Sequence, residues 1–511
     1  MKHKKFKNGF TKRGQLLVLV GFLVAIGVGA VLLRLPFMSK GDLKWTDAFF
    51  VATSAVCVTG LSPVGIANFS IWGQAVVLVL IQLGGLGIIT LSTALLLAFG
   101  GGLSFGDSLM ISNLNERFSL RGTESLLWTI VFYTFVVETA GFLLMLPGML
   151  ILNDNFKSPT GCLVAVGESI FLSVSSFCNA GFSPVTDSLR QVSRWVQFVS
   201  LLLMITGGIG IYVVYDLKER VFNRRRPKPL GGRHLLWIPA VLLIFGALGE
   251  WLFSLARVGS RGPFAGLLLL IAAGVGIYVV HERRASVAGQ RYPLHIHSKL
   301  VLWTTGGLLV FGAVFAYCLC RVEAKDISGF DALFLSATAR TCGFYTVPLA
   351  ALPESVQTLL LYLMLIGGSP GGTAGGIKTS TVALVVVAIL SVLRGDSEVM
   401  LFNRRIPTMN VLRGFTIILI FTVLAGVGAV FLQSWETGLD PQDVAFEAIS
   451  ALTTTGLSIG NTTSRLSDGG KWLLVLFMFL GRVGPFSVLG FLLGREKHSQ
   501  IQYPEERIII G

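Results

Sequence analysis

Charged side chains are scarce in this sequence, and acidic ones are the scarcest. Of its 511 residues 13% are charged and only 27 are Asp or Glu, whereas 53% are hydrophobic and the mean hydropathy is +0.74. A water-soluble globule needs more polar surface than this composition provides. The sequence therefore predicts an integral membrane protein, and its long apolar runs predict an all-α one.

Three further shortages narrow the class. The six cysteines are scattered, which predicts neither a disulfide framework nor a zinc site. The first apolar run continues to about Leu35 without a small-residue cleavage site, so we expect a retained span and not a signal peptide. No nucleotide or phosphorylation motif lies in a soluble domain. We therefore expect no enzyme activity and no organic cofactor.

The excess of basic residues, a net charge of +14, is concentrated in alternate connections between apolar runs. These are the N-terminal tail, residues 218–233, 281–299 and 394–413, and the C-terminal tail. The positive-inside rule places such loops, and so both termini, in the cytoplasm. A basic cytoplasmic face suits anionic membrane lipid or an acidic cytosolic partner, and it explains the charge without nucleic acid.

A nine-residue frame with glycine at its seventh position occurs four times. The frames begin at residues 54, 175, 337 and 450 and read SAVCVTGLS, SSFCNAGFS, ATARTCGFY and SALTTTGLS. An acidic residue precedes each glycine by 12 or 13 positions, with phenylalanine three residues after the acid; the acids are Asp47, Glu168, Asp331 and Asp443. This spacing is too regular for coincidence, and it predicts a structural repeat.

Each repeat reads as a short helix followed by a turn. An acid near the helix N-terminus faces unpaired N–H groups, and the glycine allows a backbone that other residues avoid. Irregular backbone of this kind survives in a membrane only beside protein or a watery cavity. Four such loops around one axis could replace the water shell of K⁺ with carbonyl oxygens. The expected filter residues are Val58, Thr59, Gly60, Asn179, Ala180, Gly181, Thr341, Cys342, Gly343, Thr454, Thr455 and Gly456. Ordinary glycine turns between helices are the alternative for any one frame.

A second unusual stretch, GGSPGGTAGGIKTST, spans residues 367–381 inside an apolar run. Interior glycine costs a helix about 1 kcal/mol and proline about 3 kcal/mol, so the helix should break here, within the membrane and in the ion path. A nucleotide P-loop is the rival interpretation. It fits poorly, because Ile377 separates Gly376 from Lys378 and no soluble strand–helix unit surrounds it.

The four frames and the 367–381 stretch resemble the Trk/Ktr/HKT superfamily of potassium uptake proteins over nearly the whole chain, most closely its bacterial Trk and Ktr membrane subunits. The resemblance implies four helix–pore loop–helix units, similar to a potassium-channel subunit, around one pore in the bacterial cell membrane. It also implies a homodimer with a cytosolic, nucleotide-binding regulatory ring. In plant members a serine at the first-loop glycine accompanies sodium transport, so Gly60 implies potassium. The implied gate residues are Gly371, Gly372, Thr373, Ala374, Gly375, Gly376, Lys378 and Arg482.

The predicted organisation has about ten spans. Units one and two cover residues 1–100 and 101–222, units three and four cover 298–394 and 395–494, and a tail covers 495–511. Between units two and three, residues 223–297 form an inserted pair of helices whose end, GVGIYVVHE, repeats GGIGIYVVYD from Gly207 to Asp216. His295 and His297 follow the insert, and without further ligands nearby they predict a solvated loop and not a metal site.

The leading hypothesis is therefore uptake of potassium through a gated pore, as a channel or as a symporter coupled to Na⁺ or H⁺. The alternative is a secondary transporter of sodium or a small organic solute, which should need two broken helices where this sequence shows one pronounced break. Arg482 would set a positive charge across the path or bond the carbonyls of the broken helix. Glu138 suits a structural role or the ion path, and Arg340 could brace the filter or the short helix.

Overall fold

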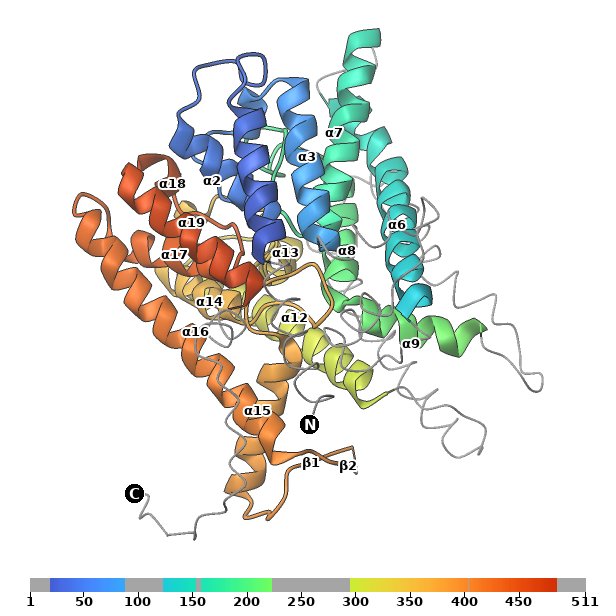
Figure 1. Cartoon of the computed structure of the whole chain (residues 1–511). Helices are drawn as coiled ribbons and strands as arrows, with labels where there is room; N and C mark the ends of the chain where they lie inside the picture. The colour runs from blue at the N-terminus through green and yellow to red at the C-terminus, as the bar shows by residue number, and fades with distance from the viewer. Residues whose placement is uncertain (1–18, 88–122, 153–157, 223–294, 403, 485–511) are drawn as a thin grey trace, which may run out of the picture.

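A computed structural model of the chain describes residues 19–87, 123–152, 158–222, 295–402 and 404–484, and Figure 1 shows it as a cartoon. These residues form helices almost throughout, apart from a short antiparallel pair, β1 (Met400–Leu401) and β2 (Arg404–Arg405). α15 leads away from the helical body to this pair (Figure 1).

One order of elements recurs four times along the chain: a helix, a shorter helix that ends in a frame, and another helix. The first set is Leu19–Leu33, α2 (Trp45–Val56) and α3 (Ile71–Leu86), with η1 (Ile66–Asn68) before α3. The second is α6 (Thr123–Ile151), α7 (Pro159–Phe177), α8 (Arg194–Ile209) and α9 (Ile211–Phe222). The third is α12 (Ile296–Val322), α13 (Gly329–Thr338), η4 (Leu349–Ala351), α14 (Glu354–Leu365) and α15 (Thr379–Leu393). The fourth is α16 (Thr408–Trp435), α17 (Pro441–Leu452), α18 (Thr462–Arg465) and α19 (Asp468–Val483).

Four of the described helices, α6, α7, α12 and α16, are long and apolar enough to cross a membrane, and there are five if the bent pair α8–α9 counts as one broken span. Their outward faces carry many exposed large apolar side chains, such as Phe132, Phe311 and Val430. An apolar surface of this extent suits lipid and not water. The count of ten spans stays a prediction, because residues 88–122 and 223–294 lie outside the described part of the chain.

The ends of the frame helices that lead into the frames are buried in the interior of the molecule. The phenylalanine three residues after each acid is at most 3% exposed in every repeat: Phe50, Phe171, Phe334 and Phe446. Lipid is as apolar as these rings, so the gain from burying them comes from close packing and not from escape from water. Their packing fixes where the frames begin.

Two helices after the frames end earlier than the sequence predicts. The apolar run over residues 72–99 predicts one helix of that length, but α3 ends at Leu86 and is followed by Gly87 with φ +80°. A helix over 195–218 is also expected, but α8 and α9 meet at an 85° bend beside Gly210, with φ +89°. The expectation of a single pronounced break is therefore wrong. In each case glycine adopts a left-handed conformation that ends the regular hydrogen bonding.

The acid is near its helix N-terminus in three repeats but not in the second. Asp47, Asp331 and Asp443 lie in the first turns of α2, α13 and α17. α7 begins at Pro159, two turns before Glu168, so the prediction fails there. The longer apolar segment of the second repeat lets the helix start earlier, with Ser158 accepting a hydrogen bond from the N–H of Gly161. Residues 223–294 of the predicted insert and the tail 495–511 lie outside the described residues.

Candidate functional site

The backbone takes the same unusual course in all four frames. Two residues before each glycine, a residue with a side chain lies in the left-handed region: Val58 (φ 57°), Asn179 (57°), Thr341 (69°) and Thr454 (53°). The glycines follow with φ of 99°, 69°, 85° and 85° at Gly60, Gly181, Gly343 and Gly456. Such a conformation costs a residue with a Cβ about 1 to 3 kcal/mol. Four copies of this strain indicate a requirement that the loops share.

The four glycines form a closed ring of contacts. A Cβ on Gly60 would lie 2.5 Å from the carbonyl oxygen of Ala180, and one on Gly181 would lie 2.6 Å from that of Cys342. The same relation joins the third loop to the fourth and the fourth back to the first. A Cβ on Gly343 would lie 2.7 Å from the carbonyl oxygen of Thr455, and one on Gly456 would lie 1.9 Å from that of Thr59. Each loop thus packs its glycine against the carbonyl of the next loop in chain order, and only glycine fits.

Hydroxyl groups at the ends of the frame helices form hydrogen bonds with the backbone of the loops that follow. Ser54 and Ser450, which open their frames, accept hydrogen bonds from the N–H of Gly60 (3.0 Å) and Gly456 (3.1 Å). In the third frame Thr338 donates instead to the carbonyl of Phe344 (2.5 Å). These bonds satisfy backbone groups that would otherwise be buried unpaired.

The residues between α14 and α15, called here the 366–378 loop, pack against the frames. Asn179 donates from its amide nitrogen to Oγ1 of Thr373 (2.8 Å), and the N–H of Gly375 donates to Oγ1 of Thr341 (3.1 Å). A Cβ on Gly375 would also lie 2.0 Å from Oγ1 of Thr454. The side chains at the strained fifth position of three frames therefore contact one loop.

The ends of the 366–378 loop are held as well. A parallel bridge between Ile366 and Ile377 closes its base, and Lys378 donates from Nζ to the carbonyl of Ala374 (2.6 Å). Gly371 and Gly376 have φ of 74° and 64°, a conformation that suits glycine. Of the predicted gate residues, Gly371 to Gly376 and Lys378 are thus brought together in one structured loop.

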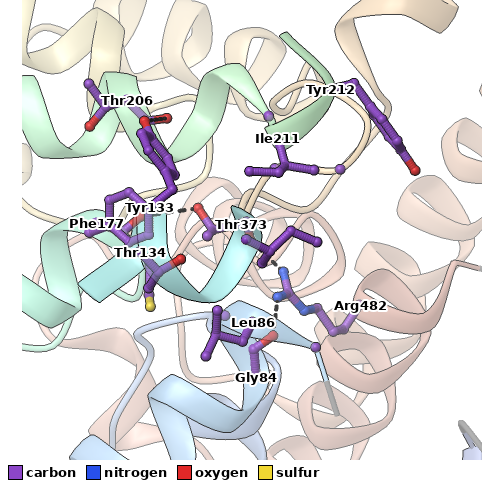
Figure 2. A pocket seen from close by; sticks show the side chains of 18 of the residues that line it. Gly84, Leu86, Tyr133, Thr134, Phe177, Thr206, Ile211, Tyr212, Thr373 and Arg482 are labelled. Carbon is purple, nitrogen blue, oxygen red and sulfur yellow. Dashed lines mark hydrogen bonds between the residues drawn. The ribbon is translucent and has the colours of Figure 1, made fainter. Parts of the chain in front are cut away.

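Arg482, near the end of α19, joins this loop to the first repeat. Its guanidinium donates from Nη1 to the carbonyl of Thr373 and from Nη2 to the carbonyl of Gly84, both at 2.5 Å (Figure 2). A cavity of about 210 Å³ adjoins these groups, and Tyr133 and Phe177 line its far side (Figure 2). A charged donor that spans two main-chain carbonyls is a strong link.

Comparison with known proteins places this geometry in a family. The family model for the cation transport protein TrkH matches residues 7–236 and 300–499. The chain belongs to the TrkH family of cation transport proteins. The matched ranges leave out residues 237–299, which overlap the predicted insert.

Relatives of this TrkH-family chain align over nearly its full length. The Ktr system potassium uptake protein B of Vibrio alginolyticus is 30% identical and aligns over 100% of this chain and 97% of its own. The potassium/sodium uptake protein NtpJ of Enterococcus hirae is 28% identical over 97% and 96% of the two chains. The crystal structure of the potassium transporter TrkH from Vibrio parahaemolyticus superposes with a TM-score of 0.62 over 95% of this chain and 85% of that one, at 18% identity, and shows the same fold. With its apolar helices, the protein is a multi-pass membrane protein.

The matching sequences QLGGLGIIT (82–90) and TGGIGIYVV (206–214) predict close helix packing or a bend in this TrkH-family protein, but they do not reveal a third copy in α19 or a contact with the frames. The motif G-x-x-G begins at Gly84, Gly207 and Gly481, where a Cβ would meet a carbonyl oxygen at the end of a frame helix. These distances are 2.0 Å to Val56, 1.9 Å to Phe177 and 1.9 Å to Leu452. The last glycine of each motif, Gly87, Gly210 or Gly484, has positive φ. Arg482 occupies the second place of the third motif, where the others have glycine, so it lies directly beside a frame.

Two buried ionisable groups, Arg340 and Glu138, lie beside frame loops. Arg340 is buried, and its Nη1 donates to the carbonyl of Thr305 in α12 (3.3 Å). This contact braces the third frame against α12. The buried carboxylate of Glu138 accepts a hydrogen bond from Gln82 (3.1 Å), and Cys178 of the second frame lies 3.8 Å away. Both residues therefore make structural contacts behind the frames.

Ion pairs between repeats also escaped the sequence analysis. Asp47 in α2 pairs with Lys471 in α19 at 2.8 Å, with both side chains about nine-tenths buried. Asp331 in α13 pairs with Arg194 in α8 at 2.5 Å and accepts a hydrogen bond from Thr346 as well. Asp47 and Asp331, at the starts of their frame helices, thus each bind a basic residue at the start of a helix from another repeat.

We expect Asp47→Asn to destabilise the folded protein by about 3 to 5 kcal/mol, because Lys471 would be left buried without its counter-charge. Thermal unfolding of the purified protein in detergent measures this change. Asp42→Asn is the matched control, since Asp42 pairs with Arg34 at 3.1 Å but its side chain is 89% exposed. An exposed pair contributes only about 0 to 1 kcal/mol. Equal melting temperatures for the two variants would contradict the structural role of the buried pair.

Proposed function

We propose that this chain takes potassium ions into the cell through one pore, formed within the single polypeptide where the four frames meet. The closed ring of glycine–carbonyl contacts is the observation that carries the proposal. Four loops in cyclic contact enclose an axis. In each loop the fifth and seventh residues are left-handed, and this alternation lets successive carbonyl groups point in the same direction. Main-chain oxygens around such an axis can take the place of water around a dehydrated cation.

Potassium is the proposed ion on two grounds. Glycine occupies the seventh place in all four frames, so no side chain narrows the ring at that level. Relatives over the full length are named for potassium uptake, although the Enterococcus hirae relative is named for potassium and sodium. Sodium is therefore the competitor to test, either as a second transported ion or as a coupling ion, with H⁺ as the other candidate for coupling.

The proposed gate is the 366–378 loop together with Arg482. The loop packs against the fifth-position side chains of three frames, so it lies on one side of the ring and close to its axis. Arg482 adds a positive charge that opposes cations and also holds the loop by Thr373. Opening would require the loop to give up these bonds. We place the control of opening in a cytosolic nucleotide-binding partner and propose a homodimer of the membrane chain.

A secondary transporter with two broken helices is the alternative, and the 85° bend between α8 and α9 supplies a second break. What favours the pore is the location of the two breaks. The N–H of Ile211, just after the bend, donates to the carbonyl of Gly371 (3.1 Å), so both breaks belong to one contact region beneath the frames. The 366–378 loop also contacts three frames, so the breaks adjoin the glycine ring, and a transporter of that type has no need of four such loops.

Ion flux in reconstituted vesicles tests the proposed function. We expect vesicles that contain the protein to take up K⁺ and Rb⁺ down an imposed gradient, faster with the cytosolic partner and its nucleotide than without, and to exclude Na⁺ largely. Restoration of growth at low potassium in a cell without other uptake systems is the parallel assay. Flux of an organic solute without any K⁺ flux would overturn the proposal.

A further inference from the structure

Glu447 is a buried carboxyl group that the filter and gate described above do not use. It lies in α17, is 0% exposed, and makes no ion pair within the described residues. Oε1 accepts hydrogen bonds from Ser458 and from Thr463 (3.0 Å), whereas Oε2 is enclosed and has no hydrogen-bond partner in the described part of the chain. An ionisable group kept at such a cost of desolvation calls for a role.

Both donors belong to the segment that follows the fourth glycine. Ser458 is the last residue of the fourth frame, two residues after Gly456, and Thr463 lies in α18. Glu447 therefore fastens the far side of the fourth loop to its helix, just as Ser450 fastens the near side through the N–H of Gly456. The loop is held from both sides by side chains of α17.

The fourth repeat is the one frame that uses a carboxyl group for this purpose. Nine residues before the glycine, where Glu447 lies, the other repeats have Val51, Leu172 and Phe334, all buried. The serines equivalent to Ser458 in the first two frames donate to main-chain carbonyls of their own loops: Ser62 to Val64 (2.5 Å) and Ser183 to Val185 (3.0 Å). At this position the fourth frame thus uses a side-chain acceptor where the first two frames use a backbone acceptor.

We propose that Glu447 is a positioning residue for ion selectivity, acting through Ser458 on the carbonyl ring at Gly456. The inference rests on the proposed function, because it assumes that this ring selects the ion. The contact at risk is the closest of the ring: a Cβ on Gly456 would lie 1.9 Å from the carbonyl oxygen of Thr59. A shift of the fourth loop would therefore separate Gly456 from the carbonyl group of Thr59 and break the ring between the fourth and first repeats.

The role needs a hydrogen-bond acceptor and not a negative charge, since the described residues present no cation to Glu447 and leave Oε2 without a donor. An amide oxygen can accept from both hydroxyl groups as the carboxylate does. Glu447→Gln is thus expected to keep selectivity near that of the wild type. Glu447→Ala and Ser458→Ala remove the link from either side and are expected to lower the Rb⁺/Na⁺ flux ratio by about tenfold each, the effect of losing one strong hydrogen bond.

The experiment measures Rb⁺ and Na⁺ flux ratios in vesicles for Glu447→Ala, Glu447→Gln, Ser458→Ala and the double alanine variant. The double variant should lose no more than either single variant, because both remove one link. Ser464→Ala is the matched control, since this exposed hydroxyl in the same segment bonds only the carbonyl of Asn461 (2.8 Å). Flux ratios compare ions within one sample, so they are independent of how much protein folds.

A wild-type flux ratio in Ser458→Ala and Glu447→Ala would overturn the inference, and so would a loss in Glu447→Gln as large as that in Glu447→Ala. Gly456→Ser in the same assay separates this failure from that of the proposed function. If Gly456→Ser changes the ratio while the Glu447 and Ser458 variants do not, the ring selects ions without the brace. If none of the variants changes the ratio, the ring itself is not the filter.

Discussion

Potassium flux through vesicles that contain Arg482→Ala, without the cytosolic partner, is expected to exceed wild-type flux by about ten- to hundredfold. Arg482 makes two charge-assisted hydrogen bonds, to the carbonyls of Thr373 and Gly84. Only the bond to Thr373 reaches the 366–378 loop directly. One bond of this type contributes about 1.5 to 3 kcal/mol, and each 1.4 kcal/mol changes an equilibrium about tenfold, which gives the expected ten- to hundredfold increase. Loss of that bond shifts the 366–378 loop toward the open position, and the barrier due to the positive charge disappears as well.

Arg482→Lys separates the two contributions of this side chain. Lysine keeps the charge but cannot reach both carbonyls with the planar fork of arginine, so we expect an increase in flux smaller than that of Arg482→Ala. Deleting residues 371–376 should raise flux at least as much as Arg482→Ala, because it removes the loop itself. Unchanged or lower flux in Arg482→Ala, with wild-type amounts of folded protein, would show that the contact does not hold a gate closed.

Gly456→Ala is expected to abolish selective potassium uptake. Its Cβ would lie 1.9 Å from the carbonyl oxygen of Thr59, far inside van der Waals contact, and the oxygen belongs to backbone that the ring holds in place. The fourth loop would have to move away from the first. We expect the initial rate of Rb⁺ uptake to fall at least about a hundredfold, the result of a barrier raised by roughly 3 kcal/mol.

Gly460→Ala is the matched control for this substitution. Gly460 lies four residues further along, also has positive φ (59°), and has no atom within 4 Å of the Cβ position. The two variants therefore share backbone strain of about 1 kcal/mol but differ in the clash with the ring. Uptake should be close to wild type in Gly460→Ala. Equal losses in both variants would mean that strain, and not closure of the ring, explains the need for glycine.

The sequence predicts the loops well because their constraint is local. A left-handed residue must be glycine wherever a Cβ has no room, and this leaves Gly60, Gly181, Gly343 and Gly456 as a visible pattern. The proline and glycines of residues 367–376 likewise predict the break between α14 and α15, because these residue types disfavour a helix wherever they occur. Local backbone demands of this kind can be read from one chain.

The misses concern contacts between repeats. The sequence around Gly84, Gly87 and Gly210 allows either close packing or a bend, and nothing in it decides between the two or shows that Gly84 packs against a frame helix. Asp47 and Lys471 are 424 residues apart, and their pairing follows only from the cyclic order of the repeats. Glu447 could have been noticed as an acid within an otherwise apolar helix, but its partners Ser458 and Thr463 could not.

The direct measurement of the central claim is the position of bound cations in a structure determined with Rb⁺ in place of K⁺. The account predicts anomalous density on the axis that the four glycines surround, within coordination distance of the carbonyl oxygens of Thr59, Ala180, Cys342 and Thr455. The density should weaken when Na⁺ replaces Rb⁺. Density confined to other cavities, with none inside the ring, would contradict the account.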